Sequence, residues 1–164
     1  MTPLPGVFVA WRLDQASFAP TWDSGEGAFR LGGRWNNPGV RAVYCALDPA
    51  TAILEVAVHK GFATLDTVAH VLTSLNLGAA ARVHVVPPDA VPNPNWLRPA
   101  PPSAGQRAFG DALLADHAFV ALPSAVSTHS WNLIFDPTRA AGLYTLAAQE
   151  RFALDPRLHP PARP

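Results

Sequence analysis

The chain has 164 residues, of which 49% are hydrophobic and 15% charged, a composition typical of one globular domain and not of a disordered chain. Its 12 basic and 12 acidic residues give a formal net charge of zero, which argues against direct nucleic-acid binding. A single cysteine, Cys45, excludes an intramolecular disulfide; with no signal-peptide pattern and no apolar run of about 18 residues, we expect a cytoplasmic protein without a membrane span.

Apolar runs near the N-terminus predict two strands separated by a long loop. Residues 7–11 suit a strand that ends at Arg12. Residues 14–37, rich in glycine, serine and asparagine, are expected to form a loop with one helical turn at most. The apolar and β-branched run at residues 40–47 predicts a buried strand.

A helix is predicted directly after this second strand. Asp48 is a suitable N-cap, and Pro49 suits the first helical position, where its missing N–H group costs nothing. The helix should run to Lys60 and stop at Gly61, because glycine readily ends a helix.

The second half of the chain predicts one further helix and several strands. Ser103 and Gln106 have the spacing of a capping box, which predicts a helix over residues 103–117. Further strands are expected at residues 67–77, 82–86, 118–122, 131–135 and 143–152. Clustered prolines predict a long irregular connection at residues 87–102, which could be a lid, a partner contact or an ordinary loop.

The strands outnumber the helices and do not alternate strictly with them. This order favours an α+β fold over a doubly wound sheet. No internal repeat or linker divides the chain, so we expect one domain over residues 1–158, followed by a flexible proline-rich tail at residues 159–164.

Glu55 is the first candidate for a functional residue. On the predicted helix it is flanked by Leu54 and Val58, so its carboxylate should project from a largely buried surface. A buried carboxylate is costly without a partner, and the structural alternative is an ion pair with Arg34 or Arg12.

A metal site is not expected. His59 lies four residues after Glu55 on the same helix face, but the other histidines are scattered and no HExxH or paired-cysteine motif is present. A local hydrogen bond is the better interpretation of His59.

Arginines and an aromatic hydroxyl suggest an anion site. Arg34 follows Gly32-Gly33, whose missing side chains allow a ligand close to the backbone, and a guanidinium there suits bidentate phosphate binding. Arg12 could be a second phosphate anchor or a solvated strand end. Tyr44 could stack on a flat ring or fill the core with its hydroxyl bonded.

Two further polar residues lie later in the chain, Ser124 after one predicted strand and Asn132 within another. Ser124 has no GxSxG elbow around it, so a hydrogen-bonding serine in a binding loop is more plausible than a nucleophile. Asn132 could fix a loop or contact a ligand.

Taken in order, these pieces resemble the RES-domain family, the toxins of RES–Xre type II toxin–antitoxin modules. The matching pieces are Trp11-Arg12, Gly33-Arg34-Trp35-Asn36, Tyr44, the Ala52-Ile-Leu-Glu55 helix with His59, Leu122-Pro-Ser124 and Asn132-Leu-Ile134. The resemblance implies a fold similar to diphtheria-toxin-type ADP-ribosyltransferases, with mixed β-sheets flanked by a few helices. NAD+ would lie in a cleft between sheet segments.

The resemblance also implies the reaction and its residues. It implies cleavage of the nicotinamide–ribose bond of NAD+ by water or phosphate, with Glu55, Arg34 and Tyr44 catalytic. Arg12, Ser124 and Asn132 would join Arg34 and Tyr44 in binding NAD+, which is the substrate, so that no cofactor is implied. The nicotinamide ring already carries the positive charge before it leaves, so one carboxylate suffices to stabilise the developing ribose cation.

A toxin of this type needs a silencing partner. The resemblance implies an Xre-type helix-turn-helix antitoxin that blocks the NAD+ cleft and binds DNA itself, which agrees with the neutral charge of this chain. A homodimer within that complex is also possible, since a net charge near zero favours association. The alternatives are an ADP-ribosyltransferase that modifies a protein target and a non-catalytic domain in which Glu55 only pairs with an arginine.

Overall fold

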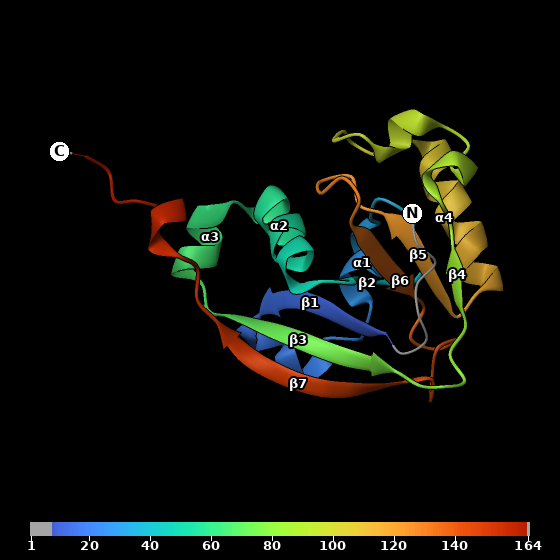
Figure 1. Cartoon of the computed structure of the whole chain (residues 1–164), viewed down its shortest axis with the longest axis horizontal. Coiled ribbons are helices and arrows are strands. Elements are labelled where there is room, and N and C mark those ends of the chain that lie inside the picture. The colour runs from blue at the N-terminus through green and yellow to red at the C-terminus, as the bar shows by residue number, and fades with distance from the viewer. Residues whose placement is uncertain (1–7, 164) are drawn as a thin grey trace.

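The computed structural model of the chain describes residues 8–163 and shows one sheet of seven strands with helices packed on it (Figure 1). The spatial strand order is β4-β5-β6-β2-β1-β3-β7, and only the β4–β5 pair is parallel. The strands are β1 (Val9–Gln15), β2 (Val43–Ala46), β3 (His70–Leu77), β4 (Val83–Val85), β5 (Phe119–Pro123), β6 (Trp131–Phe135) and β7 (Tyr144–Phe152). The expected α+β architecture is therefore present.

The α-helices lie on both halves of this sheet. They are α1 (Glu26–Leu31), α2 (Pro49–Lys60), α3 (Phe62–Thr67) and α4 (Ala104–Asp116), with short 3-10 turns η1 (Ala16–Thr21), η2 (Pro88–Ala90), η3 (Pro94–Leu97) and η4 (Pro156–Leu158). Figure 1 shows α2 and α3 above β1 and β3, whereas α4 flanks β5 and β4. The sheet bends between these halves, so that β5 and β6 rise steeply from the plane of β3 and β7.

The structure confirms the residues predicted to begin and end α2. The Asp48 side chain accepts a hydrogen bond from the Thr51 N–H at 2.8 Å, and Pro49 is the first helical residue. At the other end Gly61 has a φ of 79° and donates its N–H to the Ala57 carbonyl. A side chain is strained at such a φ, which is why glycine suits this stop.

The capping box predicted for α4 is only half formed. Ser103 Oγ accepts the Gln106 N–H at 3.1 Å, as a cap should. The Gln106 side chain is buried and instead donates from Nε2 to the Trp96 carbonyl at 3.2 Å. Gln106 therefore ties the helix to the proline-rich connection and does not close the box.

Other elements differ from the sequence expectation at their ends. Strand β1 continues past Arg12 to Gln15, and Val7 lies outside the described residues. The segment expected as loop holds η1 and the helix α1. The start of the strand predicted at residue 67 is the end of α3, because the chain turns into β3 only at His70.

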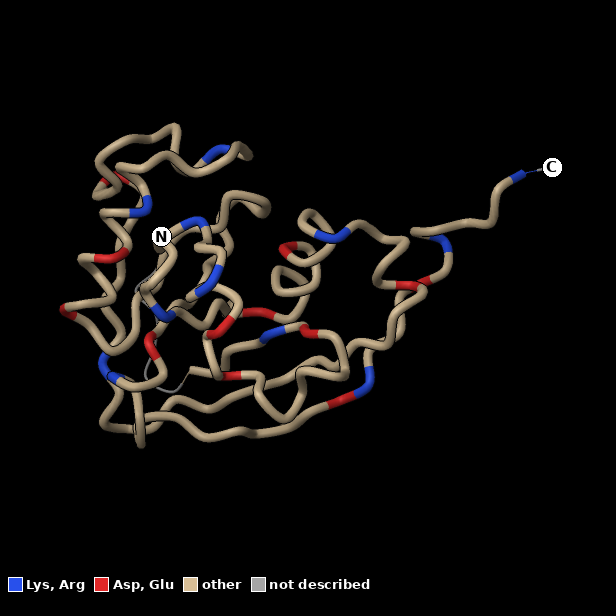
Figure 2. The backbone as a smooth tube through the Cα atoms, turned by 180° about the vertical axis from the view of Figure 1, so that it is seen from behind, with Lys and Arg blue, Asp and Glu red and all other residues tan. Residues whose placement is uncertain are grey.

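Buried apolar side chains form clusters on both faces of the sheet. One face buries Leu75, Phe119 and Phe135, and the other buries Trp35, Leu122 and Ile134 among others. A third cluster joins Leu13 of β1 to α2 and α3. Figure 2 shows basic and acidic residues interspersed along the chain, and no helix in residues 8–163 is long and apolar enough to cross a membrane.

Candidate active site

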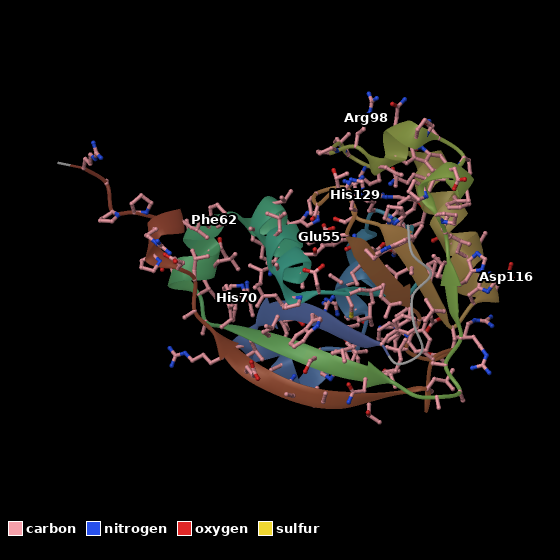
Figure 3. The ribbon with its side chains drawn as sticks, viewed as in Figure 1. Glu55, Phe62, His70, Arg98, Asp116 and His129 are labelled. Atoms are coloured by element: carbon pink, nitrogen blue, oxygen red, sulfur yellow. The ribbon has the colours of Figure 1, made fainter. Side chains whose placement is uncertain are left out.

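The carboxylate of Glu55 lies where α2 meets the ends of β5 and β6 (Figure 3). Its Oε1 atom accepts one hydrogen bond from Ser124 Oγ at 3.0 Å and another from Asn132 Nδ2 at 2.7 Å. In residues 8–163 no hydrogen bond or ion pair involves Oε2. The protein therefore holds the carboxylate by one oxygen, and the other oxygen has no partner within residues 8–163.

Strand pairing explains how these three residues meet. Ala46 at the end of β2 is opposite Asn132 of β6, and Asn132 is in turn opposite Leu122, two residues before Ser124. The chain leaves β2 and begins α2 within three residues. Glu55 lies two helical turns into α2, which brings its carboxylate back over Asn132.

Glu55 stands at the border of the buried face of α2. Ile53, Val56 and Ala57 pack against the cluster that contains Leu13 of β1, and Ala52 is also buried. Leu54 and Val58 are 38% and 59% exposed, so the expectation that both flank Glu55 within a buried surface is wrong. The carboxylate is half-buried and reaches protein donors without being sealed from solvent.

Ser124 organises the loop that carries it as well as the carboxylate. Besides donating to Glu55, its Oγ accepts the N–H groups of Val126 and Ser127 at 3.2 and 3.1 Å. The same loop contains His129, the one non-glycine residue with a positive φ (72°) in residues 8–163. Figure 3 labels His129 on the β5–β6 loop and Glu55 on α2.

Asn132 has an unused acceptor beside Glu55. The residue is 7% exposed, and its Oδ1 is buried with no hydrogen-bond partner. A buried amide oxygen without a donor is destabilising by about 1–3 kcal/mol. Because Asn132 Oδ1 is sealed from solvent and Glu55 is only half-buried, the carboxylate of Glu55 is the acceptor of this pair that a ligand can reach.

Tyr44 uses its hydroxyl within the protein. The hydroxyl donates to Asn36 Oδ1 at 2.7 Å and accepts the Trp35 N–H at 2.9 Å. Burial raises the pKa of the Tyr44 hydroxyl above its ordinary value, so the group remains a donor at neutral pH. A Cβ at Gly33 would lie 2.7 Å from this hydroxyl. Position 33 therefore requires glycine because the Tyr44 hydroxyl lies so close to its backbone.

Arg34, next to this turn, is bonded to the proline-rich connection. Its Nη1 donates to the carbonyls of Trp96 and Arg98 at 3.2 and 3.5 Å, and its Nη2 donates to the Ala100 carbonyl at 3.2 Å. These acceptors are neutral, and no carboxylate of the described chain forms an ion pair with Arg34. The positive charge of the half-buried guanidinium is therefore uncompensated.

Arg12 lies on a different face from Glu55. Side chains alternate along β1, which places Arg12 with Ala10, whereas Leu13 packs against α2. Arg12 donates from Nε to Asp14 Oδ2 and from Nη1 to the Tyr44 carbonyl, each at 2.8 Å. The structure thus connects Arg12 to the Tyr44 backbone and not to Glu55.

The ion pair considered for Glu55 is not formed with either Arg34 or Arg12, since no salt bridge among residues 8–163 includes Glu55. Neutral donors on Ser124 and Asn132 take that place. His59 is exposed, and the described residues contain no cluster of three potential metal ligands.

Two residues that were not proposed as site residues, Asn36 and Arg107, complete the arrangement. Asn36 is fully buried and donates to three backbone carbonyls, which shapes the turn that carries Arg34. Arg107 of α4 donates from Nε to the Gly33 carbonyl at 3.1 Å. The sequence marked Asn36 only as part of the Gly33-Arg34-Trp35-Asn36 motif, and nothing local marked Arg107, whose partner lies 74 residues away.

Comparison with known proteins identifies the family. The model of the RES domain family matches residues 9–155. The chain belongs to the RES-domain family. Curated relatives named "Toxin Res" from Photorhabdus laumondii and Pseudomonas putida are each 30% identical, over 130 and 154 residues. These alignments cover 79% and 92% of this chain, and 81% and 99% of the relatives.

A solved structure also has this fold. It is titled as the M. tuberculosis MbcT-MbcA toxin-antitoxin complex, and the match has a TM-score of 0.70 at 23% identity. The match covers 90% of this chain and 85% of the other. It confirms the fold class expected from the sequence, a single α+β domain.

Proposed function

We propose that this RES-domain protein is a toxin that degrades NAD+ by breaking its nicotinamide–ribose bond. Membership of the RES family and the curated relatives named as toxins support the toxin role. The observation that carries the chemistry is the Glu55 carboxylate. Ser124 and Asn132 hold its Oε1, while Oε2 has no partner in the described part of the chain.

Such a carboxylate suits an oxocarbenium-like transition state. As the bond from the ribose carbon to the nicotinamide nitrogen breaks, its electron pair goes to the nitrogen, and nicotinamide leaves neutral. The ribose carbon becomes positively charged, and the fixed carboxylate stabilises that charge or holds a ribose hydroxyl. Water then forms the new carbon–oxygen bond and releases a proton to give ADP-ribose; phosphate in place of water gives a phosphorylated ADP-ribose.

The remaining site residues have roles in binding. Arg34, whose charge is uncompensated, binds the pyrophosphate, and Tyr44 holds the turn that presents Arg34. Asn132 and Ser124 support the site by holding Glu55 Oε1. Arg12, a predicted phosphate anchor, supports the site by holding the Tyr44 carbonyl. NAD+ enters as substrate, and the proposed chemistry uses no resident cofactor.

The proposal includes an antitoxin partner. The solved structure with this fold is a toxin–antitoxin complex by its title, which supports a protein partner for this chain. We propose that the partner is of the helix-turn-helix, Xre type and binds the operator DNA, since this chain has a net charge of zero.

The test is release of free nicotinamide from NAD+ by the purified chain, with and without phosphate. The wild type should release nicotinamide, and Glu55→Gln should lower kcat by about 100-fold or more, because the neutral amide cannot stabilise the cation. Arg34→Ala should weaken NAD+ binding and reduce kcat/KM. Glu150→Gln is the matched control, since Glu150 is exposed on β7 without an ion pair among the described residues.

The outcomes separate the candidate reactions. Dependence on phosphate would name the attacking group. Transfer of labelled ADP-ribose to a protein acceptor would instead support the alternative function, an ADP-ribosyltransferase that modifies a protein target. A folded wild type that releases no nicotinamide under any of these conditions would overturn the proposal.

A further inference from the structure

The proline-rich connection supplies an unusual set of acceptors to one arginine. The carbonyls of Trp96, Arg98 and Ala100 all accept hydrogen bonds from Arg34, which lies 62 to 66 residues earlier. None of these carbonyls belongs to a β-strand. Three carbonyls of one loop therefore converge on a single guanidinium, an arrangement that the pairing of β-strands does not produce.

The hydrogen bonds do not use all the donors of the guanidinium. The three carbonyls accept from Nη1 and Nη2, and no hydrogen bond within residues 8–163 involves Nε of Arg34. Nε and Nη2 lie along one edge of the planar group. Two N–H donors on such an edge have the spacing that binds two oxygens of a phosphate at once.

The connection itself is firmly anchored. The Trp96 ring packs against Phe109 and Trp35 with centroid distances of 5.8 and 6.5 Å. The Trp96 carbonyl accepts a second hydrogen bond from the buried Gln106 of α4. Two acceptor residues, Arg98 and Ala100, each precede a proline, which restricts their backbone to extended conformations.

We propose that residues 96–100 are a positioning element for Arg34, and that Trp96 is its anchor. The three carbonyls fix the guanidinium plane, so that its Nε–Nη2 edge is presented to a diphosphate. This inference rests on the proposed NAD+ site and names the part of the ligand that Arg34 contacts. Arg107 adds positive charge to the same turn through its bond to the Gly33 carbonyl.

The first test is a double-mutant cycle in which the Kd of ADP-ribose is measured by calorimetry. ADP-ribose has no nicotinamide–ribose bond, so binding is measured in the absence of the proposed reaction. Trp96→Ser should raise the Kd of ADP-ribose about tenfold, and Trp96→Phe should restore most of the affinity, because the aromatic anchor remains. In an Arg34→Ala background, Trp96→Ser should change the Kd by less than about twofold. Pro88→Ala, an exposed change in the same connection, is the control and should leave binding unaltered.

A loss of affinity from Trp96→Ser that is equally large in the Arg34→Ala background would overturn the proposal, since Trp96 would then not act through Arg34. Failure of ADP-ribose to bind the folded wild type would overturn it as well. Neither result depends on nicotinamide release, which tests the proposed reaction separately.

Hydrogen exchange provides the second test. If the carbonyls position Arg34, the backbone amides of residues 95–98 and of Ala100 should exchange as slowly or more slowly after ADP-ribose is added. Faster exchange would mean that the ligand pulls Arg34 away from the connection, and the positioning role would be wrong. Arg34→Lys should also bind ADP-ribose poorly, because a lysine has only three donors for the carbonyls and the ligand together.

Discussion

At the scale of single residues, the site depends on side chains that serve another side chain. Ser124 and Asn132 hold Glu55, and Tyr44 holds the Trp35–Asn36 turn, so the geometry of the candidate site rests on hydrogen bonds from uncharged donors. Such bonds are worth about 1 kcal/mol when made and cost more when a buried partner is left alone. The stability lost on substituting one of these residues should therefore depend on whether its former hydrogen-bond partner is left buried without another partner.

The two tyrosines of the chain allow this to be measured. Tyr44→Phe removes the partner of the Trp35 N–H and of Asn36 Oδ1, both on fully buried residues. We expect a loss of about 1–3 kcal/mol in the free energy of unfolding, measured by urea denaturation. Tyr144→Phe removes one hydrogen bond to Asp23, whose half-buried carboxylate can be hydrated instead, and should cost less. Equal losses in the two variants would contradict this reasoning.

At the scale of elements, the site is assembled by close contact between α4 and the turn that carries Arg34. Gly110 lies against the Trp35 backbone, and a Cβ built there would be 1.8 Å from the Trp35 carbonyl oxygen. Asp111 of the next helical position accepts two hydrogen bonds from Asn37. Helix α4 therefore fits the turn only because one residue on this face has no side chain.

Gly110→Ala should be destabilising although alanine is the better helix former. The helix propensity favours alanine by about 1 kcal/mol, but displacing α4 from Trp35 should cost more, for a net loss of about 2 kcal/mol. Gly27→Ala in α1 is the control, because a Cβ there meets nothing within 4 Å. Thermal unfolding should show a lower Tm for the first variant and an unchanged or higher Tm for the second.

At the scale of the whole molecule, one continuous sheet joins the α2–α3 half to the α4 half. We expect the stability of the protein in mild acid to depend on a histidine pair at the β4 edge of this sheet. The His84 and His117 rings stack with centroids 3.9 Å apart. They line a surface hollow of about 380 Å³ together with Arg82 and Asp116. Desolvation, followed by the charge of His117, holds the pKa of His84 below its ordinary value of 6.5.

This shift predicts weaker folding in mild acid. Because the folded state disfavours protonated His84, the unfolded chain takes up protons first as the pH falls below about 6.5. The stability should be fully present above that pH and decline towards pH 5. His84→Gln should reduce the fall in Tm between pH 7.5 and 5.5 by about 1–2 °C, a small change for an exposed group. His59→Gln should follow the wild type; an identical fall in all three proteins would rule out this role of His84.

Local signals in the sequence determined much of this protein. The caps at Asp48 and Gly61 predicted α2 because such signals act within a few residues, and the order of strands predicted the α+β class. The ordered motifs indicated the RES family, and they included Glu55, Ser124 and Asn132 before their contact was known. The assignments of NAD+-binding residues remain predictions.

Only the tertiary structure decided how these residues are used. Strand register brought Asn132 and Ser124 to Glu55 across 77 and 69 residues, and it turned Arg12 to the other face of the sheet. It also placed the carbonyls of the proline-rich connection around Arg34. A sequence records which donors and acceptors exist, but their partners depend on long-range pairing and packing, which no local pattern contains.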